Sequence, residues 1–366
     1  MSRPLRIAVV MPPTVSGDPA SAVASWTTVT GTLAAVHAAA DVEFEVFGRH
    51  LDRQAAWSAG NDTYSFLPSD RSLAAAVAGA GVDLVHVHGL FSNRLVWSLR
   101  RALPRHVPIV LQHHGEPVPG RRARWAHAIL RRRIAGYLFT GAELGHAQPF
   151  IDGGVFAPGA RLFDVLESAS TLPARPPPAP AALAGTPSIL WVGRLIEGKD
   201  PLTALAAFAA AAGSSPHAHL HLLATDRTLE PAVRAQLAAL GPAADRVHLH
   251  HPVAHAEMPS WYAAADVYLS TSRREAANYS LIEALSFGCA PAVSDIPPHR
   301  AIVGTLAPCF PVGDAAAAGD VITAVTALSR GDVIAHSATH LAWGVVARQL
   351  LATWQTLACA RVAELA

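Results

Sequence analysis

Cysteine is scarce in this sequence, which has three in 366 residues, Cys289, Cys309 and Cys359, and no CxxC pair. This spacing argues against a disulfide scaffold and a zinc knuckle, and it suits a reducing compartment. No apolar run approaches the ~18 residues of a membrane-spanning helix. The opening MSRPLRIAVVM has too short an apolar stretch for a secretory signal and predicts a first strand. We therefore expect a cytoplasmic protein.

Charged residues are also few, because they make up 15 % of the sequence against 51 % hydrophobic residues. That balance is typical of a globular protein with a large buried interior and excludes a disordered chain. The net charge of +1 gives no general case for nucleic acid, so no nucleic-acid partner is expected. A chain of 366 residues is too long for one ordinary core and predicts two domains.

Signatures of metal sites are missing although the sequence has 19 histidines. HAHLHLL places His217, His219 and His221 on one face of a predicted strand, and HLHH adds His248 and His250. There is no HExxH, and neither cysteines nor carboxylates lie among these histidines. We therefore expect no metal site and no cofactor.

Short β-rich runs alternate with alanine-rich helical stretches along the chain, a pattern typical of α/β proteins with parallel sheets. In the first half the predicted strands are 6–11, 42–47, 84–88, 109–112 and 136–140, and the predicted helices are 22–39, 72–80, 94–103 and 122–133. In the second half the predicted strands are 189–192, 219–223, 247–250, 267–270 and 290–293. One long helix is predicted over 339–361.

A proline-rich stretch, TLPARPPPAPAALAGTP, separates the two halves and predicts a linker over 171–187. We therefore expect an N-terminal domain over 1–170 and a C-terminal domain over 188–345. For the last helix, 346–366, packing back on the N-terminal domain is one option. Two α/β domains joined in this way make a natural cleft, with ligands at the carboxyl ends of the strands.

The stretch SRREAANYSLIEAL places two carboxylates around a predicted helix N-terminus. Ser280 and Glu283 have the S-x-x-E spacing of a capping box, which is the structural explanation for Glu283. Glu275 precedes the helix at the end of a predicted strand, where α/β domains bind ligands. Backbone N–H groups from Asn278 to Leu281 would make the helix start an anion site. A phosphate flanked by carboxylates that accept from hydroxyls describes a nucleotide-sugar.

A second segment, ILWVGRLIEGKD, agrees with this interpretation. Gly193 lets the backbone turn sharply off a buried strand. Arg194 and Lys199 can then reach one diphosphate, the arginine in bidentate fashion and the lysine as a point charge. The alternative is a solvated pair of surface charges, but the strand–Gly–Arg–x4–Lys order favours the diphosphate site.

Three stretches of the second half together resemble the retaining glycosyltransferase family 4, the glycosyl transferases group 1 with the GT-B fold. They are WVGRLIEGKDPLTALAAF, MPSWYAAADVYLSTSRREAANYSLIEALSFGCAPAVSD, which matches the E-x7-E region, and THLAWGVVARQLLATW. The resemblance covers most of 187–355. It implies two Rossmann-like domains with parallel sheets facing across a cleft, and a donor site in the second domain. The sequence has no D-x-D motif of metal-dependent sugar transferases, so protein cations are expected to handle the leaving group.

The resemblance implies a role for each matching residue. Arg194 and Lys199, after Gly193, would hold the donor pyrophosphate and neutralise charge on the departing nucleotide. Glu275 would face the sugar hydroxyls, and Glu283 would accept from the ribose hydroxyls. The phosphates would bind to backbone N–H groups of Asn278, Tyr279, Ser280 and Leu281.

The first half matches the family less well. Family members carry a glycine-rich loop after the first strand, and here only Ser16 and Gly17 keep that feature on the acceptor side. DLVHVHGLFS and PIVLQHHGEP each end a predicted strand with histidines. By the resemblance, His114 lies near the anomeric carbon, where its imidazole would bind a sugar hydroxyl or orient the acceptor. His88 is a further candidate for the acceptor side, and the alternative for both is an ordinary strand-end histidine.

The strongest local charge is in GRRARWAHAILRRRIAG, a predicted basic amphipathic helix between Arg121 and Arg133. A helix of this kind can lie on an anionic membrane or meet a phosphorylated acceptor. The alternative is a solvated helix face beside a packed apolar stripe. Peripheral contact with the inner membrane face is therefore an option for this protein.

Together these features predict an enzyme that moves a hexose from a nucleoside diphosphate sugar to a hydroxyl acceptor with retention of configuration. His114, Glu275, Lys199 and Arg194 are the predicted catalytic residues. A UDP-sugar is favoured over a GDP-sugar, and the acceptor can be a small molecule, lipid-linked or a saccharide. Two alternatives remain, a nucleotide-sugar epimerase of the same fold and a catalytically inactive GT-B protein that binds a nucleotide-sugar or glycan.

Overall fold

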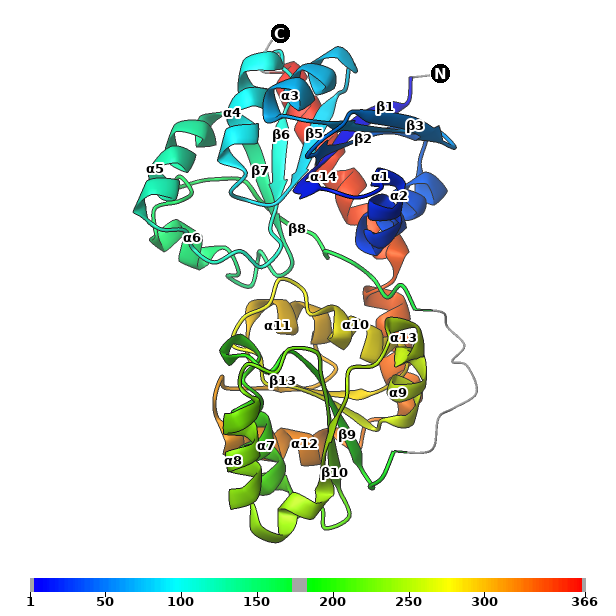
Figure 1. Ribbon diagram of the computed structural model, residues 1–366, viewed down its shortest axis with the longest axis vertical. Helices are drawn as coiled ribbons and strands as arrows, with labels where there is room; N and C mark the ends of the chain where they lie inside the picture. The colour runs from blue at the N-terminus through cyan, green and yellow to red at the C-terminus, as the bar shows by residue number, and fades with distance from the viewer. Residues whose placement is uncertain (1–2, 173–182, 364–366) are drawn as a thin grey trace. The chain divides into compact units, whose positions relative to one another are not determined.

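The computed structural model describes residues 3–172 and 183–363, with 12–14 and 360–363 as backbone only. Its contacts divide the chain into two compact units. The first unit comprises Met1–Ser168 and Trp343–Ala366, and the second comprises Ala169–Ala342. Each unit consists of a largely parallel sheet flanked by helices (Figure 1).

The first unit is built on an eight-stranded sheet in the order β3-β4-β2-β1-β5-β6-β7-β8. All neighbouring strands are parallel except β3 and β4, which form an antiparallel hairpin at one edge. The central strand β6 is buried along its whole length, as expected for a parallel sheet covered on both faces. The strands are β1 (Leu5–Val15), β2 (Val42–His50), β3 (Ala55–Ala59), β4 (Asp62–Leu67), β5 (Leu84–His88), β6 (Ile109–Gln112), β7 (Ile134–Phe139) and β8 (Leu162–Asp164).

The helices of the first unit start at recognisable caps. Asp18 caps α1 by accepting from the N–H of Ser21 at 2.8 Å, and Ser69 caps α3 in the same way through Ser72. The helices are α1 (Pro19–Ser25), α2 (Thr27–Ala39), α3 (Asp70–Gly79), α4 (Asn93–Ala102), α5 (Arg121–Leu130), the 3-10 turn η1 (Arg131–Arg133) and α6 (Gln148–Asp152). The predicted helix 22–39 is broken at Trp26, whose φ of −84° and ψ of 59° lie outside the helical region.

The last helix, α14 (Trp343–Ala363), belongs to the first unit and packs against α2. Trp354 is 1 % exposed, with its ring 5.9 Å from that of Phe44. Gly31 on α2 makes room for Trp343, since a Cβ at this glycine would lie 2.4 Å from the indole. The prediction of one helix over 339–361 is wrong, because the buried Leu341 leaves the helical conformation at φ −122° and ends α13 (Arg330–His340) in the second unit.

The second unit has a six-stranded parallel sheet in the order β11-β10-β9-β12-β13-β14. Its strands are β9 (Ser188–Gly193), β10 (His219–Ala224), β11 (Val247–His250), β12 (Val267–Ser270), β13 (Ala290–Ser294) and β14 (Cys309–Phe310). The helices before α13 are α7 (Pro201–Ala211), α8 (Glu230–Ala239), α9 (Met258–Ala264), α10 (Tyr279–Ser286), α11 (Pro297–Val303) and α12 (Ala315–Val325). The 3-10 turns are η2 (Glu197–Lys199), η3 (Gly241–Arg246) and η4 (His255–Glu257).

The predicted fold class, two α/β domains with parallel sheets, is confirmed. Each predicted strand is present, but β3, β4, β8 and β14 were not predicted. β3 is a largely exposed edge strand, and β8 and β14 have only three and two residues, too few for a recognisable pattern. Of the predicted linker 171–187, residues 173–182 lie outside the described residues.

Candidate functional site

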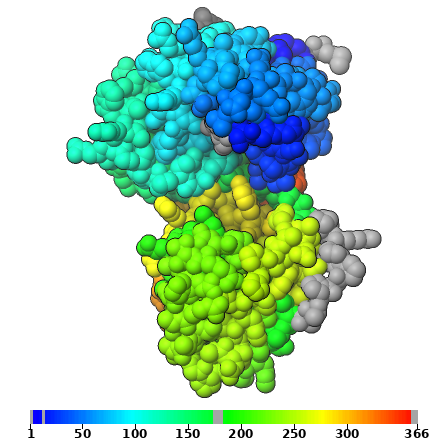
Figure 2. Space-filling view, in the orientation of Figure 1, coloured from blue at the N-terminus to red at the C-terminus, as the bar shows by residue number. Residues whose placement is uncertain are grey.

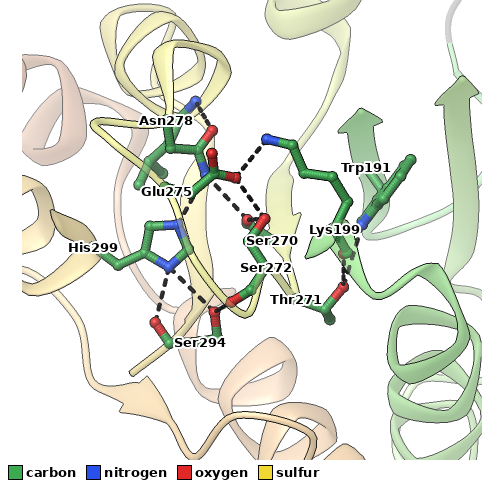
Figure 3. A network of polar contacts seen from close by, with 10 residues as sticks. Trp191, Lys199, Ser270, Thr271, Ser272, Glu275, Asn278, Ser294 and His299 are labelled. Atoms are coloured by element: carbon green, nitrogen blue, oxygen red, sulfur yellow. Dashed lines mark hydrogen bonds and ion pairs between the residues drawn. The ribbon is translucent and has the colours of Figure 1, made fainter. Parts of the chain in front are cut away.

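Lys199 and Glu275 meet at the carboxyl edge of the second sheet (Figure 3). Lys199 closes η2, the turn after β9, and Glu275 lies in the loop after β12. Nζ of Lys199 is 2.5 Å from Oε1 of Glu275, and the two side chains are 21 % and 11 % exposed. They come together because β9 and β12 are adjacent parallel strands, whose carboxyl ends share one edge.

The protein uses only one oxygen of Glu275. Oε1 accepts from Ser272 Oγ at 2.6 Å as well as from Lys199. Among the contacts of the described residues, Oε2 has no hydrogen bond, and it is not one of the fully buried polar atoms. Glu275 therefore keeps an open acceptor while Lys199 balances its charge, an arrangement suited to a ligand hydroxyl.

Helix α10 begins differently from the prediction. Its N-cap is Asn278, which has φ +62° and accepts at Oδ1 from the N–H of Leu281 at 3.3 Å. Ser280 lies inside the helix, so the predicted capping box of Ser280 and Glu283 is wrong. Asparagine takes the cap because it tolerates the left-handed backbone and its short side chain reaches the third helical N–H.

The backbone donors at the start of α10 are partly occupied. The N–H of Leu281 is taken by the oxygens of Asn278 and is not free for a phosphate, contrary to prediction. Within the described part of the chain, the N–H groups of Asn278 and Ser280 donate to no protein acceptor. Tyr279 is the first helical residue, and its side chain is 40 % exposed. The helix start thus retains unbonded N–H groups close to Glu275.

A buried histidine that the sequence analysis missed holds Asn278 in place. His299 of α11 is 0 % exposed and accepts at Nε2 from Nδ2 of Asn278 at 2.9 Å (Figure 3). Its Nδ1 donates to the carbonyl of Ser294 at 2.8 Å. Burial lowers the pKa of His299 to about 4, so the ring is neutral at pH 7, as an acceptor at Nε2 must be. Its place in IPPHR, directly after β13, is the sequence signal that could have identified it.

Both oxygens of Glu283 already have partners. The carboxylate is 7 % exposed and accepts from the hydroxyl of Tyr262 at 3.0 Å and from Nε2 of His255 at 2.7 Å. Tyr262 is fully buried, whereas the side chain of His255 is 57 % exposed. A ligand hydroxyl that binds Glu283 would therefore replace His255 and not Tyr262.

Arg194 stands apart from this pair. It is exposed and follows Gly193, the last residue of β9. The pKa of Asp226 is lowered, first by hydrogen bonds from Thr228 and further by the charge of Arg194. Its carbonyl accepts the N–H of Ile196 at 2.8 Å, but for the residues that the structure describes the side chain of Arg194 makes no hydrogen bond or ion pair. The structure thus brings Lys199 to Glu275 but does not bring Arg194 into contact with either.

In the first unit, His88, His114 and Glu167 form a line of hydrogen bonds at the carboxyl edge of the sheet. Nδ1 of His88 lies 2.9 Å from Nε2 of His114, and Nδ1 of His114 is hydrogen-bonded to Oε1 of Glu167. Glu167 is 6 % exposed. The sequence analysis missed Glu167 because it follows β8, a strand too short to predict.

The pKa values of the two histidines move in opposite directions. Burial lowers the pKa of His114, but the charge and hydrogen bond of Glu167, with the charge of Glu116, raise it more, so that the pKa is raised overall. Burial lowers the pKa of His88 well below its usual value, and the neighbouring His86 and His114 lower it further. Glu116 also fixes the backbone of His114, whose N–H it accepts at 2.7 Å.

These contacts determine which ring atom is available. A carboxylate only accepts, so Nδ1 of His114 is a donor. Protonated His114 also donates from Nε2 to His88, whose own proton then sits on Nε2. Neutral His114 accepts from Nδ1 of His88, and Nε2 of His88 becomes an acceptor. Both nitrogens of His114 are occupied by protein groups, whereas Nε2 of His88 has no hydrogen bond among the described residues and is not fully buried.

Ser16 and Gly17 follow β1 at the same edge, and Gly17 is hydrogen-bonded to His50. Nε2 of His50 donates to the carbonyl of Gly17 at 2.8 Å, while its Nδ1 accepts the N–H of Asp52 at 3.1 Å. A Cβ at Gly17 would meet nothing within 4 Å. Glycine therefore meets no steric need here, and the loop depends on a buried histidine.

The histidines of β10 and β11 bind one another. His219 pairs with His248 at 2.9 Å and His221 with His250 at 3.0 Å, with the rings of each pair stacked. Across the two described stretches of the chain, no group of three or more histidines, cysteines or carboxylates is arranged to hold a metal ion.

Comparison with known proteins shows which family and which solved structures this chain is similar to. Residues 186–327 match the family model described as Glycosyl transferases group 1, which is less than half of the chain but contains Lys199, Glu275 and Glu283. No curated protein matches the sequence. A solved trehalose-6-phosphate structure from E. coli, bound with UDP-2-fluoro glucose, is 14 % identical with a TM-score of 0.69 and covers 95 % of this chain and 98 % of its own.

Two further solved structures have a similar fold over nearly the whole chain. A sucrose-phosphate synthase from Thermosynechococcus elongatus is 16 % identical with a TM-score of 0.67, covering 97 % of this chain and 100 % of its own. An Anabaena protein in complex with UDP and glucose is 13 % identical with a TM-score of 0.63, covering 95 % and 99 %. The fold is GT-B. Within this GT-B chain the family match falls on the second unit, which holds Lys199 and Glu275.

Proposed function

We propose that this protein is a glycosyltransferase that moves a hexose from a nucleoside diphosphate sugar to a hydroxyl acceptor. The observation behind the proposal is the Lys199–Glu275 pair beside the start of α10, inside the segment that matches Glycosyl transferases group 1. A cation, an open carboxylate oxygen and unbonded helix N–H groups are the contacts that a sugar diphosphate needs. The UDP-containing structures of similar fold favour a uridine donor, with guanosine second.

Each donor contact has a proposed part in the reaction. Lys199 would turn from Glu275 to the pyrophosphate, where its charge stabilises the departing nucleoside diphosphate. Arg194, on the same loop and with no hydrogen bond or ion pair from its side chain among the described residues, would add a second cation. Glu275 would accept from a sugar hydroxyl at Oε2. Glu283 would accept from a ribose hydroxyl in place of His255.

Retention is proposed to follow from displacement on one face of the sugar. The bond from the anomeric carbon to the phosphate oxygen breaks, and that oxygen takes the proton of the acceptor hydroxyl as the new bond forms. In this reaction the protein orients the donor and acceptor and supplies cations that stabilise the leaving group, but it supplies no nucleophile. On the acceptor side, His88 with its open Nε2 is the proposed contact, and His114 orients it. The acceptor class, small molecule, lipid-linked or saccharide, is left open by these contacts.

Ligand screening tests the proposal. UDP, GDP and their hexose conjugates should raise the melting temperature by mass action, most strongly for the true donor. Product analysis then separates the alternatives. A transferase releases free nucleoside diphosphate by transfer or slow hydrolysis, an epimerase yields a new nucleotide-sugar without it, and an inactive binder yields neither. Stabilisation by none of these ligands would contradict the donor site itself.

A further inference from the structure

Arginine is concentrated in one stretch of the first unit. Residues 84–142 contain ten arginines and one acidic residue, Glu116. The whole chain has a net charge of only +1, so the rest of it carries a net charge of −8, which is +1 minus the +9 of this stretch. The single carboxylate of this stretch, Glu116, accepts from the backbone N–H groups of Leu90 and His114, so these hydrogen bonds are made to the backbone and not to the arginines. The stretch is therefore a strongly basic region on a chain of nearly zero charge.

The structure shows which of these arginines face solvent. Arg124 donates to the carbonyl of Gly153 at 2.7 Å and Arg133 to that of Val107 at 2.9 Å, so both are tied to the protein. The exposed ones on α5 and η1 are Arg121, Arg122 and Arg132. On the neighbouring helix α4 and just after it, the exposed ones are Arg94, Arg100, Arg101 and Arg105.

Large apolar side chains stand among these arginines. Trp125 is 71 % exposed, Trp97 is 44 % and Ile129 is 40 %, and Trp125 has the highest exposure of any large hydrophobic residue in the described structure. On α5, residues 122, 125, 129 and 132 recur at the spacing of one helix face, while His127 and Leu130 on the opposite face are buried.

The two helices present one continuous surface. The guanidinium of Arg100 lies 5.3 Å from the ring centre of Trp97, and its Nη1 donates to the carbonyl of Ile129 at 3.4 Å. The α4–α5 pair lies at the outside of its sheet in the ribbon view, and the cyan to blue-green atoms of this stretch form an outer face of the first unit (Figures 1 and 2). The sequence pointed to α5 alone, whereas the structure adds α4 and removes Arg124 and Arg133.

We propose that this α4–α5 surface, with Trp97, Trp125 and Ile129 among its arginines, docks on an anionic lipid bilayer. Arginines that surround exposed tryptophans match the interface of such a membrane, where the cations meet lipid phosphates and the indoles enter the headgroup layer. None of the helices in the described residues is long and apolar enough to cross a membrane. The proposed contact is between the α4–α5 surface and the surface of the bilayer. The proposal does not depend on the glycosyltransferase reaction.

Vesicle flotation tests this surface with the full chain. Binding is expected to vesicles of phosphatidylcholine mixed with phosphatidylglycerol, to be absent with phosphatidylcholine alone, and to weaken as salt shortens the Debye length. Each basic residue near such a surface contributes roughly fivefold to the partition, so Arg121→Glu with Arg122→Glu should lower it at least ~10-fold. Trp125→Ser with Ile129→Ser should lower it at low salt too, because the apolar contact is lost.

A matched control carries the same change of charge elsewhere. Arg71→Glu with Arg234→Glu replaces two other exposed arginines, one on α3 and one on α8, and should leave vesicle binding unchanged. Melting curves of all variants confirm folding. Equal loss in both arginine pairs, or no dependence on phosphatidylglycerol in the wild type, overturns the proposal. Retention on an RNA or heparin column without vesicle binding also overturns it, because the surface would then recognise a different polyanion.

Discussion

The ammonium group of Lys199 lies 2.5 Å from Glu275, and Lys199 is the only lysine in the sequence. Both side chains are largely shielded from solvent. Removal of either one would therefore leave the other as an unpaired charge that water solvates poorly. A donor diphosphate would compete for the lysine and leave Glu275 to the sugar. The two residues are therefore expected to act as a unit.

Substitution at this pair should show that coupling in the kinetics. Lys199→Ala and Glu275→Ala are each expected to lower kcat/KM at least ~100-fold, as loss of a transition-state contact does, and Arg194→Ala to do the same. The Lys199→Ala/Glu275→Ala double variant should lose less than the product of the single losses. Arg234→Ala, on an exposed arginine of α8, is the control. Near wild-type rates in all three single variants would refute the site.

The single lysine permits a direct chemical test. An amine-reactive reagent can modify only Lys199 and the α-amino group of the chain, and mass spectrometry separates the two products. We expect a saturating nucleoside diphosphate sugar to slow acylation of Lys199 by at least ~10-fold, because the phosphate covers the amine. The Lys199→Arg variant should lose the internal label and keep the N-terminal one. If a ligand that stabilises the protein leaves acylation of Lys199 unchanged, Lys199 is not at the phosphate.

Asn278 links the backbone of the site to its buried support. Asn278→Ala should cost about 2 kcal/mol of unfolding free energy, roughly half from the lost cap and half from the left-handed backbone. Asn278→Gly accepts the φ of +62° and should recover most of that loss, but it also removes the contact with His299. Urea unfolding measures the cost, and calorimetry with UDP should show weaker binding in both variants. If both variants bind UDP with wild-type affinity, the start of α10 does not contact the nucleotide.

Much of the fold could be predicted from the sequence because parallel strands that are covered on both faces are continuous apolar runs. β5 and β6 are such runs, and their predicted bounds agree with the structure. Edge and very short strands lack that signal, as β3 and β14 show. The candidate site residues of the second unit could also be picked out from the sequence, since the glycine, the cations and the carboxylates lie at fixed spacings after predicted strands.

The remaining parts depend on contacts between distant residues. Glu167 meets His114 across 53 positions, and no local pattern marks a carboxylate that follows a three-residue strand. The cap of α10 shows a different limit. Ser280 satisfied a local spacing rule, but the chain took Asn278 because His299 and Ser270 hold its amide from outside the helix. Tertiary contacts decided between two sequence-compatible caps.

The proposed hydrogen bond from a ribose hydroxyl of the nucleotide to Glu283 can be tested by substitution. Because His255 occupies Oε1 from an exposed position, His255→Ala should leave UDP binding unchanged or tighten it up to ~10-fold, whereas Glu283→Gln should weaken it. Wild-type protein should bind UDP more tightly than its 2′-deoxy or 3′-deoxy analogue, and Glu283→Gln should remove that difference. Discrimination that survives Glu283→Gln would assign the carboxylate a purely structural role with Tyr262.

The His114–Glu167 contact predicts a pH dependence with a definite sign. The pKa of His114 is raised in the folded protein, so its contribution to stability is fully present below its ordinary pKa of about 6.5 and is lost as pH rises through the raised value. Glu167→Gln removes the main charge that raises the pKa of His114, so that only the charge of Glu116 then opposes the effect of burial. Unfolding free energy of the wild type should therefore fall with pH above about 6.5 more steeply than that of Glu167→Gln.

The same variant should shift catalysis. Protonation of His114 decides whether Nε2 of His88 donates or accepts, so the pH profile of kcat/KM should contain a limb that follows His114. In Glu167→Gln the midpoint of that limb should move to lower pH, because the imidazolium has lost its carboxylate. Glu143→Gln, at an exposed glutamate of the same unit, is the control and should leave the midpoint in place. A profile with the same midpoint in Glu167→Gln, together with unchanged His114 titration by NMR, would show that the contact does not control the proton.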